Sequence, residues 1–313
     1  MHILVVMRNA PTPTIGVHTR NLAMLRALCQ VSQVTLLIVA DDVSVETEIA
    51  RALADQVAGV RVVPAAPFKL KRLYQLAGVL LKHPSIVWRY SSPALGRALH
   101  ELLAQGAYDA VYFEGIMVAG HASELCARVI IDEHNLEWEL LQRSAQRAPT
   151  RLRRVFNQRE SDALRRVELA TLGRADLVVV TSERERVILE DLLPKTTVAV
   201  APNGVDTGVF SPQGASAEIP GRIVYTGAMN YHPNEQAALM FAEQCWPAIR
   251  SARPDATWYI VGANPPASIW RLAELPGVTV TGAVPETRSY LAAAQVTLAP
   301  LLVGGGTQRC TFG

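Results

Sequence analysis

The two halves of this sequence meet at Val198-Ala199-Val200-Ala201-Pro202-Asn203-Gly204-Val205-Asp206. Residues 197–201 alternate β-branched and small apolar side chains, which is typical of a buried strand. Pro202 cannot continue a strand, and Asn203-Gly204 tolerates positive φ, so the strand is expected to end in a turn. We therefore interpret this stretch as the last strand of one structural unit, followed by its exit loop.

Strand–helix units precede this junction, and the same alternation begins again at Arg222 after a polar, loop-like interval. A chain of 313 residues is also long enough for two domains of ordinary size. We predict an α/β protein with a first domain at residues 1–205, a linker at 206–221 and a second domain at 222–313. The alternative is a loop within one large sheet.

The composition narrows the class of protein. A net charge of +2 provides no global field that would attract nucleic acid. The four cysteines are scattered without a C-x-x-C pair, as expected for reduced thiols rather than for a disulfide framework or a zinc site. The first apolar run is too short for a signal peptide, and no run approaches the ~18 residues needed to span a bilayer. We expect a soluble, cytoplasmic protein without a nucleic-acid partner.

The chain opens with a strand, a loop and a helix, the order that begins a Rossmann-type fold. Residues 2–7 form an uninterrupted apolar run typical of a buried parallel strand, and residues 17–28 repeat apolar side chains at helical spacing. The loop between them contains one glycine, Gly16, and no G-x-G-x-x-G, which disfavours a dehydrogenase. Gly16 either approaches a ligand or merely eases the turn.

Further elements follow from the same periodicities. In the first domain we expect strands at residues 34–40, 60–63, 108–113, 128–131 and 177–180, and helices at 45–57, 95–103, 151–172 and 183–193. Ser92 and Pro93 are expected to cap and open the helix at 95–103. The long helix at 151–172 is expected to bury Leu152, Phe156, Ala163, Val167 and Ala170. In the second domain we expect strands at 222–226, 256–261, 278–281 and 296–299, and a helix at 235–250.

Polar residues stand where two strands of the first domain end. Glu114 follows one strand, and Asp132-Glu133-His134-Asn135 follows the next. Because ligands of an open parallel sheet gather beyond the carboxyl ends of its strands, these side chains are candidates for a binding site. Successive strand residues point to opposite faces, so Asp132, Glu133 and His134 cannot all converge on one metal ion. His134 is either a site residue or a residue that only fixes the following loop.

A glycine run lies near the end of the chain. Gly304-Gly305-Gly306-Thr307 comes after the expected strand at 296–299. Glycines in this position let backbone N–H groups approach a phosphate closely. A loop without a ligand is the alternative.

Two segments are rich in basic residues. Residues 68–90 carry Lys69, Lys71, Arg72, Lys82 and Arg89, without an acidic residue and interleaved with apolar ones. Such a segment either lies on an anionic membrane or forms a surface helix with a solvated face. The arginine-rich residues 143–166 leave the same alternatives, with the solvated face preferred.

Several stretches taken together resemble the large family of retaining glycosyltransferases with two Rossmann-like domains, the GT-B family 4. The resemblance is carried by Asp132-Glu133-His134-Asn135-Leu136-Glu137, by residues 175–182, by Pro202-Asn203-Gly204-Val205-Asp206 with Phe210, by residues 225–234 and by Gly282-Ala283-Val284-Pro285. The stretches in the second domain resemble sugar transferases of bacterial exopolysaccharide clusters. Their order and spacing extend over nearly the whole chain.

The resemblance implies a nucleotide-sugar donor bound to the second domain and a saccharide or lipid-linked acceptor bound to the first. Transfer would occur in the cleft that the two domains face, without a required metal or other cofactor, and UDP- and GDP-linked donors both remain open. By position it implies that Gly16, Glu114 and His134 lie near the reacting groups. The residues implied to face the donor are Gly227, Asn230, Tyr231, Asn234, Gly304, Gly305, Gly306 and Thr307.

Two departures from the family pattern affect the expected activity. Where many members hold the diphosphate with an arginine and a lysine, this chain has Ala228 and Asn234. The family's later basic residue and glutamate would fall near Cys310 and Gly313, where the chain stops. We therefore expect a truncated second domain that binds a donor poorly and does not catalyse transfer. The alternatives are a catalytically inactive homologue and a sugar-nucleotide epimerase.

Overall fold

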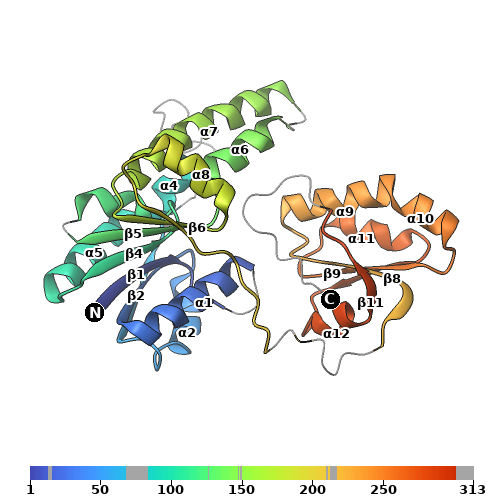
Figure 1. The fold of residues 1–313 in the computed structure, drawn as a ribbon, viewed down its shortest axis with the longest axis horizontal. Coiled ribbons are helices and arrows are strands. Elements are labelled where there is room, and N and C mark those ends of the chain that lie inside the picture. Colours follow the sequence, from blue (N-terminus) through green and yellow to red (C-terminus); the bar gives the residue numbers. More distant parts are fainter. Residues whose placement is uncertain are drawn as a thin grey trace. The chain divides into compact units, whose positions relative to one another are not determined.

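The computed structural model describes residues 1–12, 16–67, 84–125, 127–146, 148, 150–208, 211 and 217–300. These residues fall into two compact units, the first extending to Asn203 and the second beginning at Gly204. Each unit is an α/β sandwich with a parallel sheet of its own (Figure 1). The units are described separately below.

The first unit is built on a seven-stranded parallel sheet with the strand order β3-β2-β1-β4-β5-β6-β7. The order reverses between β1 and β4, and in open α/β sheets ligands bind at such a switch point, beyond the carboxyl ends of the strands. The strands are β1 (His2–Arg8), β2 (Gln33–Ala40), β3 (Gly59–Pro64), β4 (Ala110–Glu114), β5 (Arg128–Glu133), β6 (Leu177–Val180) and β7 (Val198–Val200).

Helices cover both faces of this sheet, which explains why its central strands are apolar on both sides. Along β1, Leu4 and Val6 pack into one core, whereas Ile3 and Val5 pack into the core on the opposite face. Figure 1 shows α1 and α2 on one side of the sheet and α5 on the other. The helices are α1 (Gly16–Val31), α2 (Val43–Arg51), α4 (Ser85–Tyr90), α5 (Pro93–Gln105), η1 (Ala119–Glu124), α6 (Glu137–Gln146), α7 (Arg151–Leu172) and α8 (Glu183–Leu192).

The cap predicted for α5 is confirmed. The Ser92 hydroxyl accepts a hydrogen bond from the Leu95 N–H at 3.2 Å, and Pro93 occupies the first turn. The Ser92 hydroxyl also donates to the Pro64 carbonyl oxygen at 3.1 Å. One side chain therefore caps the helix and ties it to the end of β3.

Two predictions of burial in the first unit are wrong. Strand β7 is not buried, because it is the edge strand of the sheet and is only half covered. Helix α7 has the predicted bounds, but Leu152 and Ala170 are exposed, and its buried side includes Glu160 and Glu168. The helix packs on α6 and η1 through a partly polar face, which apolar periodicity alone does not detect.

The second unit contains a four-stranded parallel sheet, β10-β9-β8-β11, in its described residues. All four strands predicted for this unit are present, but β8 begins three residues before the expected start, and β11 begins and ends two residues before the strand expected at 296–299. Trp258 is fully buried on β9, and its ring lies 4.7 Å from that of Phe241 and 5.8 Å from that of Trp246. The elements are β8 (Ile219–Thr226), α9 (His232–Gln244), α10 (Trp246–Ala252), β9 (Thr257–Val261), α11 (Ala267–Trp270), η2 (Arg271–Glu274), β10 (Val278–Gly282), α12 (Arg288–Ala292) and β11 (Ala294–Thr297).

The prediction of a single helix at residues 235–250 is wrong. Two helices occupy this region, and they meet at Cys245, because Pro247 stands in the first turn of α10 and cannot donate a backbone hydrogen bond to the preceding turn. Residues 301–313, which carry the expected glycine loop and the expected truncation, lie outside the described residues. Among the helices that the structure describes, none is long and apolar enough to cross a membrane.

Candidate functional site

A cluster of charged side chains lies at the switch point of the first sheet. Arg8 ends β1 and Glu114 ends β4, the two strands at which the strand order reverses. The Arg8 backbone N–H donates to the Glu114 carboxylate at 3.0 Å. Asp132 lies beside Glu114 in the register of β4 and β5. Polar groups of three neighbouring strands therefore meet at one edge of the sheet, where a ligand of such a fold binds.

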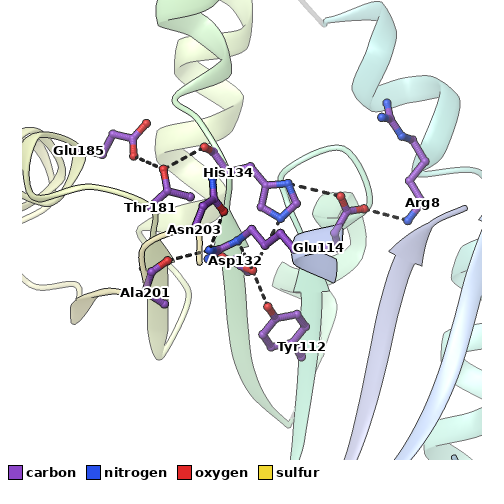
Figure 2. Close-up of polar contacts among 10 residues, drawn as sticks. Arg8, Tyr112, Glu114, Asp132, His134, Thr181, Glu185, Ala201 and Asn203 are labelled. Carbon is purple, nitrogen blue, oxygen red and sulfur yellow. Dashed lines mark hydrogen bonds and ion pairs between the residues drawn. The ribbon is translucent and has the colours of Figure 1, made fainter. Parts of the chain in front are cut away.

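Asp132 is the most strongly held group of this cluster. Its carboxylate accepts two hydrogen bonds from Arg20 on α1, from Nε at 3.2 Å and from Nη2 at 2.6 Å. It also accepts one from the Tyr112 hydroxyl at 2.6 Å (Figure 2). Burial favours the neutral acid, but His134 and Arg20 outweigh it and lower the pKa of Asp132. Asp132 is therefore a fixed anion.

The His134 imidazole lies between two carboxylates. Its Nδ1 is 3.6 Å from Glu114 Oε1, and its Nε2 is 3.6 Å from Asp132 Oδ2 (Figure 2). These are ion-pair distances, and Nε2 is a buried nitrogen without a hydrogen-bond partner among the described residues. Burial opposes protonation, but Asp132 and Glu114 outweigh it and raise the pKa of His134. The ring is oriented by charge and keeps one nitrogen unsatisfied.

The backbone of His134 is also held in place. The Thr181 hydroxyl, just after β6, shares its one proton between the His134 carbonyl oxygen at 3.2 Å and Glu185 at 2.9 Å (Figure 2). Glu185 is buried at the start of α8, and it also accepts from Ser182 at 2.9 Å. The loop after β5 is thus anchored to the next strand, so His134 starts from a rigid position.

Glu133 points away from this cluster, as the alternation along a strand predicts. It is buried near Glu168 of α7, whose carboxylate accepts from the Glu137 and Trp138 N–H groups at 3.1 and 3.2 Å. Burial, followed by the charge of Glu168, raises the pKa of Glu133 well above the ordinary value, and burial, followed by the charge of Glu137, does the same for Glu168. Burial also raises the pKa of Glu137 to about 7, against the opposing charges of His134 and Arg8.

No group of three metal-ligating side chains converges within the part of the chain that the structure describes. The structure brings together His134 and Glu114, and places Gly16 at the first residue of α1, one turn before Arg20. Sequence reasoning missed Arg20, Tyr112 and Glu137 as members of the site. Helical periodicity offered no signal for Arg20, because it marks apolar positions such as Leu22 and Leu25, whereas Arg20 is buried beside another polar residue, Asn21.

The carboxyl edge of the second sheet is lined by glycines. Gly227 follows β8, Gly262 follows β9 and Gly282 ends β10. A side chain at Gly262 would have its Cβ 1.7 Å from the Gly227 carbonyl oxygen, so only glycine allows this approach. The Met229 N–H donates to the Ala263 carbonyl oxygen at 3.0 Å, which holds the loop after β8 against the loop after β9.

The side chain of Asn234 forms hydrogen bonds within this loop and to β8. Its side-chain N–H donates to the Ala228 carbonyl oxygen at 3.0 Å, and its amide oxygen accepts from the Tyr225 hydroxyl at 3.3 Å. A Cβ atom at position 227 would lie only 2.7 Å from this amide nitrogen, so the side chain of Asn234 occupies the space beside Gly227. Asn230 and Tyr231 are exposed at the start of α9, whereas the expected donor loop Gly304 to Thr307 lies outside the described residues.

Several solved structures share the fold of this chain. The chain resembles trehalose-6-phosphate synthase OtsA at a TM-score of 0.60 and 12% identity, over 98% of this chain and 80% of that one. It resembles the E. coli trehalose-6-phosphate enzyme bound to UDP-2-fluoro glucose at 0.59 and 13%, over 97% and 79%. It also resembles Arabidopsis thaliana UGT89C1 complexed with UDP-L-rhamnose at 0.53 and 13%, over 95% and 73%. The fold is therefore that of the GT-B glycosyltransferases.

Family models identify the chain more closely. The model described as Glycosyltransferase Family 4 matches residues 44–209, more than half of the chain. The model described as Glycosyl transferases group 1 matches residues 220–311. The chain belongs to glycosyltransferase family 4. No curated protein sequence matches it.

Proposed function

We propose that this chain transfers a sugar, with retention of configuration, from a nucleotide-sugar donor to a saccharide or lipid-linked acceptor. Family membership supports the reaction class. The observation that carries the proposal is the buried His134 imidazole, held between two carboxylates at the switch point with Nε2 unsatisfied. An oriented group with unmet hydrogen-bonding capacity is suited to a sugar hydroxyl or a phosphate oxygen. Synthesis of exopolysaccharide or another cell-surface glycan is the context that the sequence resemblance suggests.

His134 and Glu114 are the residues proposed to act at the acceptor side. The raised pKa of His134 increases the fraction of imidazolium near neutral pH, and an imidazolium donates a strong hydrogen bond to an anionic oxygen. Glu114 holds the opposite ring nitrogen in this role. Gly16 is proposed to allow close approach of a ligand at the start of α1.

The donor is proposed to bind at the glycine-lined edge of the second sheet. Gly227, Asn230, Tyr231 and Asn234 would form this side of the site, with the residues of the glycine run at 304–307. Asn234 would act by holding the loop, since its side chain already bonds within it. Similar structures contain UDP-sugars, so UDP-glucose is the first donor to test and GDP-mannose the second. The proposed reaction needs no metal or other cofactor, and it should proceed in the presence of a chelator.

The proposal includes a cytoplasmic location with contact to an anionic membrane. Of the basic segment at 68–90, only residues from 84 onward are described, and there Arg89 forms an ion pair with Asp41 at 2.6 Å. A second surface supports the contact. The first turn of α7 exposes three arginines without an acidic residue, and beside them Leu152 is 83% and Val155 50% exposed. Cations at a helix N-terminus oppose its dipole, so this turn gains from an external anion.

Transfer from labelled donors tests the proposed function. The full chain would be incubated with labelled UDP-glucose or GDP-mannose and with glycolipid extracts, and the label would be followed into product. We expect His134→Ala to lower turnover about a hundredfold or more, with little change in the melting temperature. His100→Ala, at an exposed position on α5, should retain activity.

Each other outcome favours a different function. If the folded chain transfers no label with any donor, the inactive homologue becomes the better interpretation. An isomerised nucleotide-sugar as the product would favour the epimerase. Full activity of His134→Ala would contradict the proposed role of the imidazole.

A further inference from the structure

Arg20 is a buried cation that no step of the proposed reaction uses directly. Its side chain is 7% exposed, and that of Asp132, its partner, is 1% exposed. Besides the paired bonds to Asp132, its Nη1 donates to the Ala201 carbonyl oxygen at 2.7 Å and to the Asn203 side-chain oxygen at 3.2 Å. One planar guanidinium therefore joins α1, the tip of β5 and the segment through which the chain leaves β7.

The contacts of one carboxylate oxygen define what Arg20 does to the site. Asp132 Oδ2 accepts from Arg20 Nε at 3.2 Å and from the Tyr112 hydroxyl at 2.6 Å. The same oxygen is the one 3.6 Å from His134 Nε2. Arg20 and Tyr112 thus compete with His134 for this oxygen, and the imidazole is left at ion-pair distance.

We propose that Arg20 is a positioning residue that holds the Asp132 carboxylate back from His134 and ties that carboxylate to the segment that follows β7 at Ala201 and Asn203. This inference rests on the proposed role of His134 in transfer. With Arg20 in place, Nε2 of the imidazole stays available to a substrate oxygen. Without Arg20, Asp132 would be free to close a direct hydrogen bond to Nε2.

The charges around His134 predict in which direction its pKa changes when Arg20 is replaced. Asp132 and Glu114 raise the pKa of the imidazole, and Arg20 lowers it. Loss of Arg20 removes a positive charge and frees a carboxylate, and both changes favour the imidazolium. The charged and titratable groups that face His134 or its neighbours are Arg8 on β1, Arg20 on α1, Tyr112 and Glu114 on β4, Asp132 on β5 and Glu137 on α6.

Histidine titration by NMR tests the inference without requiring activity. The full chain would be labelled on histidine, and the His134 signal would be assigned by its loss in His134→Gln. We expect the pKa of His134 to be higher in Arg20→Gln than in the wild type. Arg26→Gln, at an exposed position of the same helix, should leave it unchanged. An unchanged His134 pKa in a folded Arg20→Gln variant would overturn the proposal.

A second variant covers the case in which Arg20→Gln does not fold. Arg20→Lys keeps the charge, but an ammonium cannot form two parallel bonds to Asp132 while also reaching Ala201 and Asn203. The pKa of His134 should still rise in this variant, by less than in Arg20→Gln. If it does not change, the positioning role is wrong.

Kinetics then separate this inference from the proposed function. If wild-type transfer is detected, Arg20→Gln should lower kcat about tenfold or more, with KM for the donor nearly unchanged, because the donor is proposed to bind the second unit. The limb of the pH–rate profile that reports His134 should move to higher pH. If the wild type transfers nothing while the His134 pKa responds to Arg20, the proposed function fails and the positioning role stands.

Discussion

At the scale of single residues, alternation along β5 separates two kinds of acid–base environment. Asp132 faces Arg20 and His134, whose positive charges lower its pKa despite burial. Its neighbour Glu133 faces the opposite side, where burial and the nearby carboxyl of Glu168 raise its pKa. The pKa values of two adjacent carboxyls are thus shifted in opposite directions, because successive strand residues point to opposite faces of the sheet.

Glu137 gives a testable pH dependence at this scale. Its pKa is raised to about 7 in the folded chain, whereas a glutamate in an unfolded chain titrates near 4.3. The folded chain therefore holds this proton more tightly, and the resulting stability is present below about pH 4.3 and lost as the pH rises through 7. The loss is at most about 4 kcal/mol. Glu137→Gln cannot lose the proton, so its melting temperature relative to wild type should rise between pH 5 and pH 8.

The matched control is Glu48→Gln. Glu48 is exposed on α2, and its replacement should shift the melting temperature by the same small amount at every pH. The interpretation of Glu137 is wrong if the difference in melting temperature between Glu137→Gln and wild type is also independent of pH.

At the scale of single elements, α6 and α7 form an antiparallel pair joined by a buried carboxyl. Figure 1 shows the two helices lying side by side. Glu168 on α7 accepts hydrogen bonds from the first two N–H groups of α6, which would otherwise have no partner inside that helix. A polar residue on the inner side of α7 is therefore part of the packing between the two helices.

The cap of α5 is a second element whose contribution can be measured. Ser92→Ala should lower the free energy of unfolding of the first unit by about 1 kcal/mol, within a range of about 0.5–2, because the Leu95 N–H loses its acceptor. Ser92→Thr should restore most of this loss. Ser123→Ala, at an exposed position of η1, is the control and should have almost no effect. An equal free energy of unfolding in Ser92→Ala and in wild type would show that the cap does not stabilise the first unit.

The first turn of α7 tests the proposed membrane contact. Flotation with vesicles of phosphatidylcholine and phosphatidylglycerol should capture the wild type at low salt. Capture should weaken at 1 M salt, where screening shortens to about 3 Å. Replacing Arg151 and Arg154 by Gln and Leu152 by Ser should lower capture several-fold. Arg97→Gln, exposed on α5, should not. Equal capture by pure phosphatidylcholine vesicles would contradict an electrostatic contact.

At the scale of the whole molecule, each unit has its own hydrophobic core, so each should unfold in its own transition. In calorimetry, Ser92→Ala should lower the midpoint temperature of the first unit's transition, which identifies that transition. Millimolar UDP-glucose or GDP-mannose should raise the transition of the second unit alone, because a ligand stabilises the unit that binds it. If the nucleotide-sugar raised only the transition temperature of the first unit, our proposal that the donor binds the second unit would be wrong.

Local sequence determined much of this fold because strand and helix signals act over a few residues. The apolar run at residues 2–7 marked β1, the pair Ser92-Pro93 marked the start of α5, and the bounds of α7 were predicted to the residue. Alternation also predicted that Asp132 and His134 would face one side and Glu133 the other. These features depend on backbone geometry within one element, and so they can be derived from a short window of sequence.

Only the tertiary structure decided which residues meet. Arg20 and Asp132 are 112 positions apart, and their bidentate pair exists because the strand order places β5 near the helix that follows β1. The same is true of burial, since β7 is half exposed as an edge strand and Leu152 is exposed on a helix whose inner side carries glutamates. Periodicity shows which residues share a face, but the neighbour that covers this face is set by sheet order and packing. For that reason His134 and Glu114 could be predicted as candidates, whereas the cation that holds Asp132 could not.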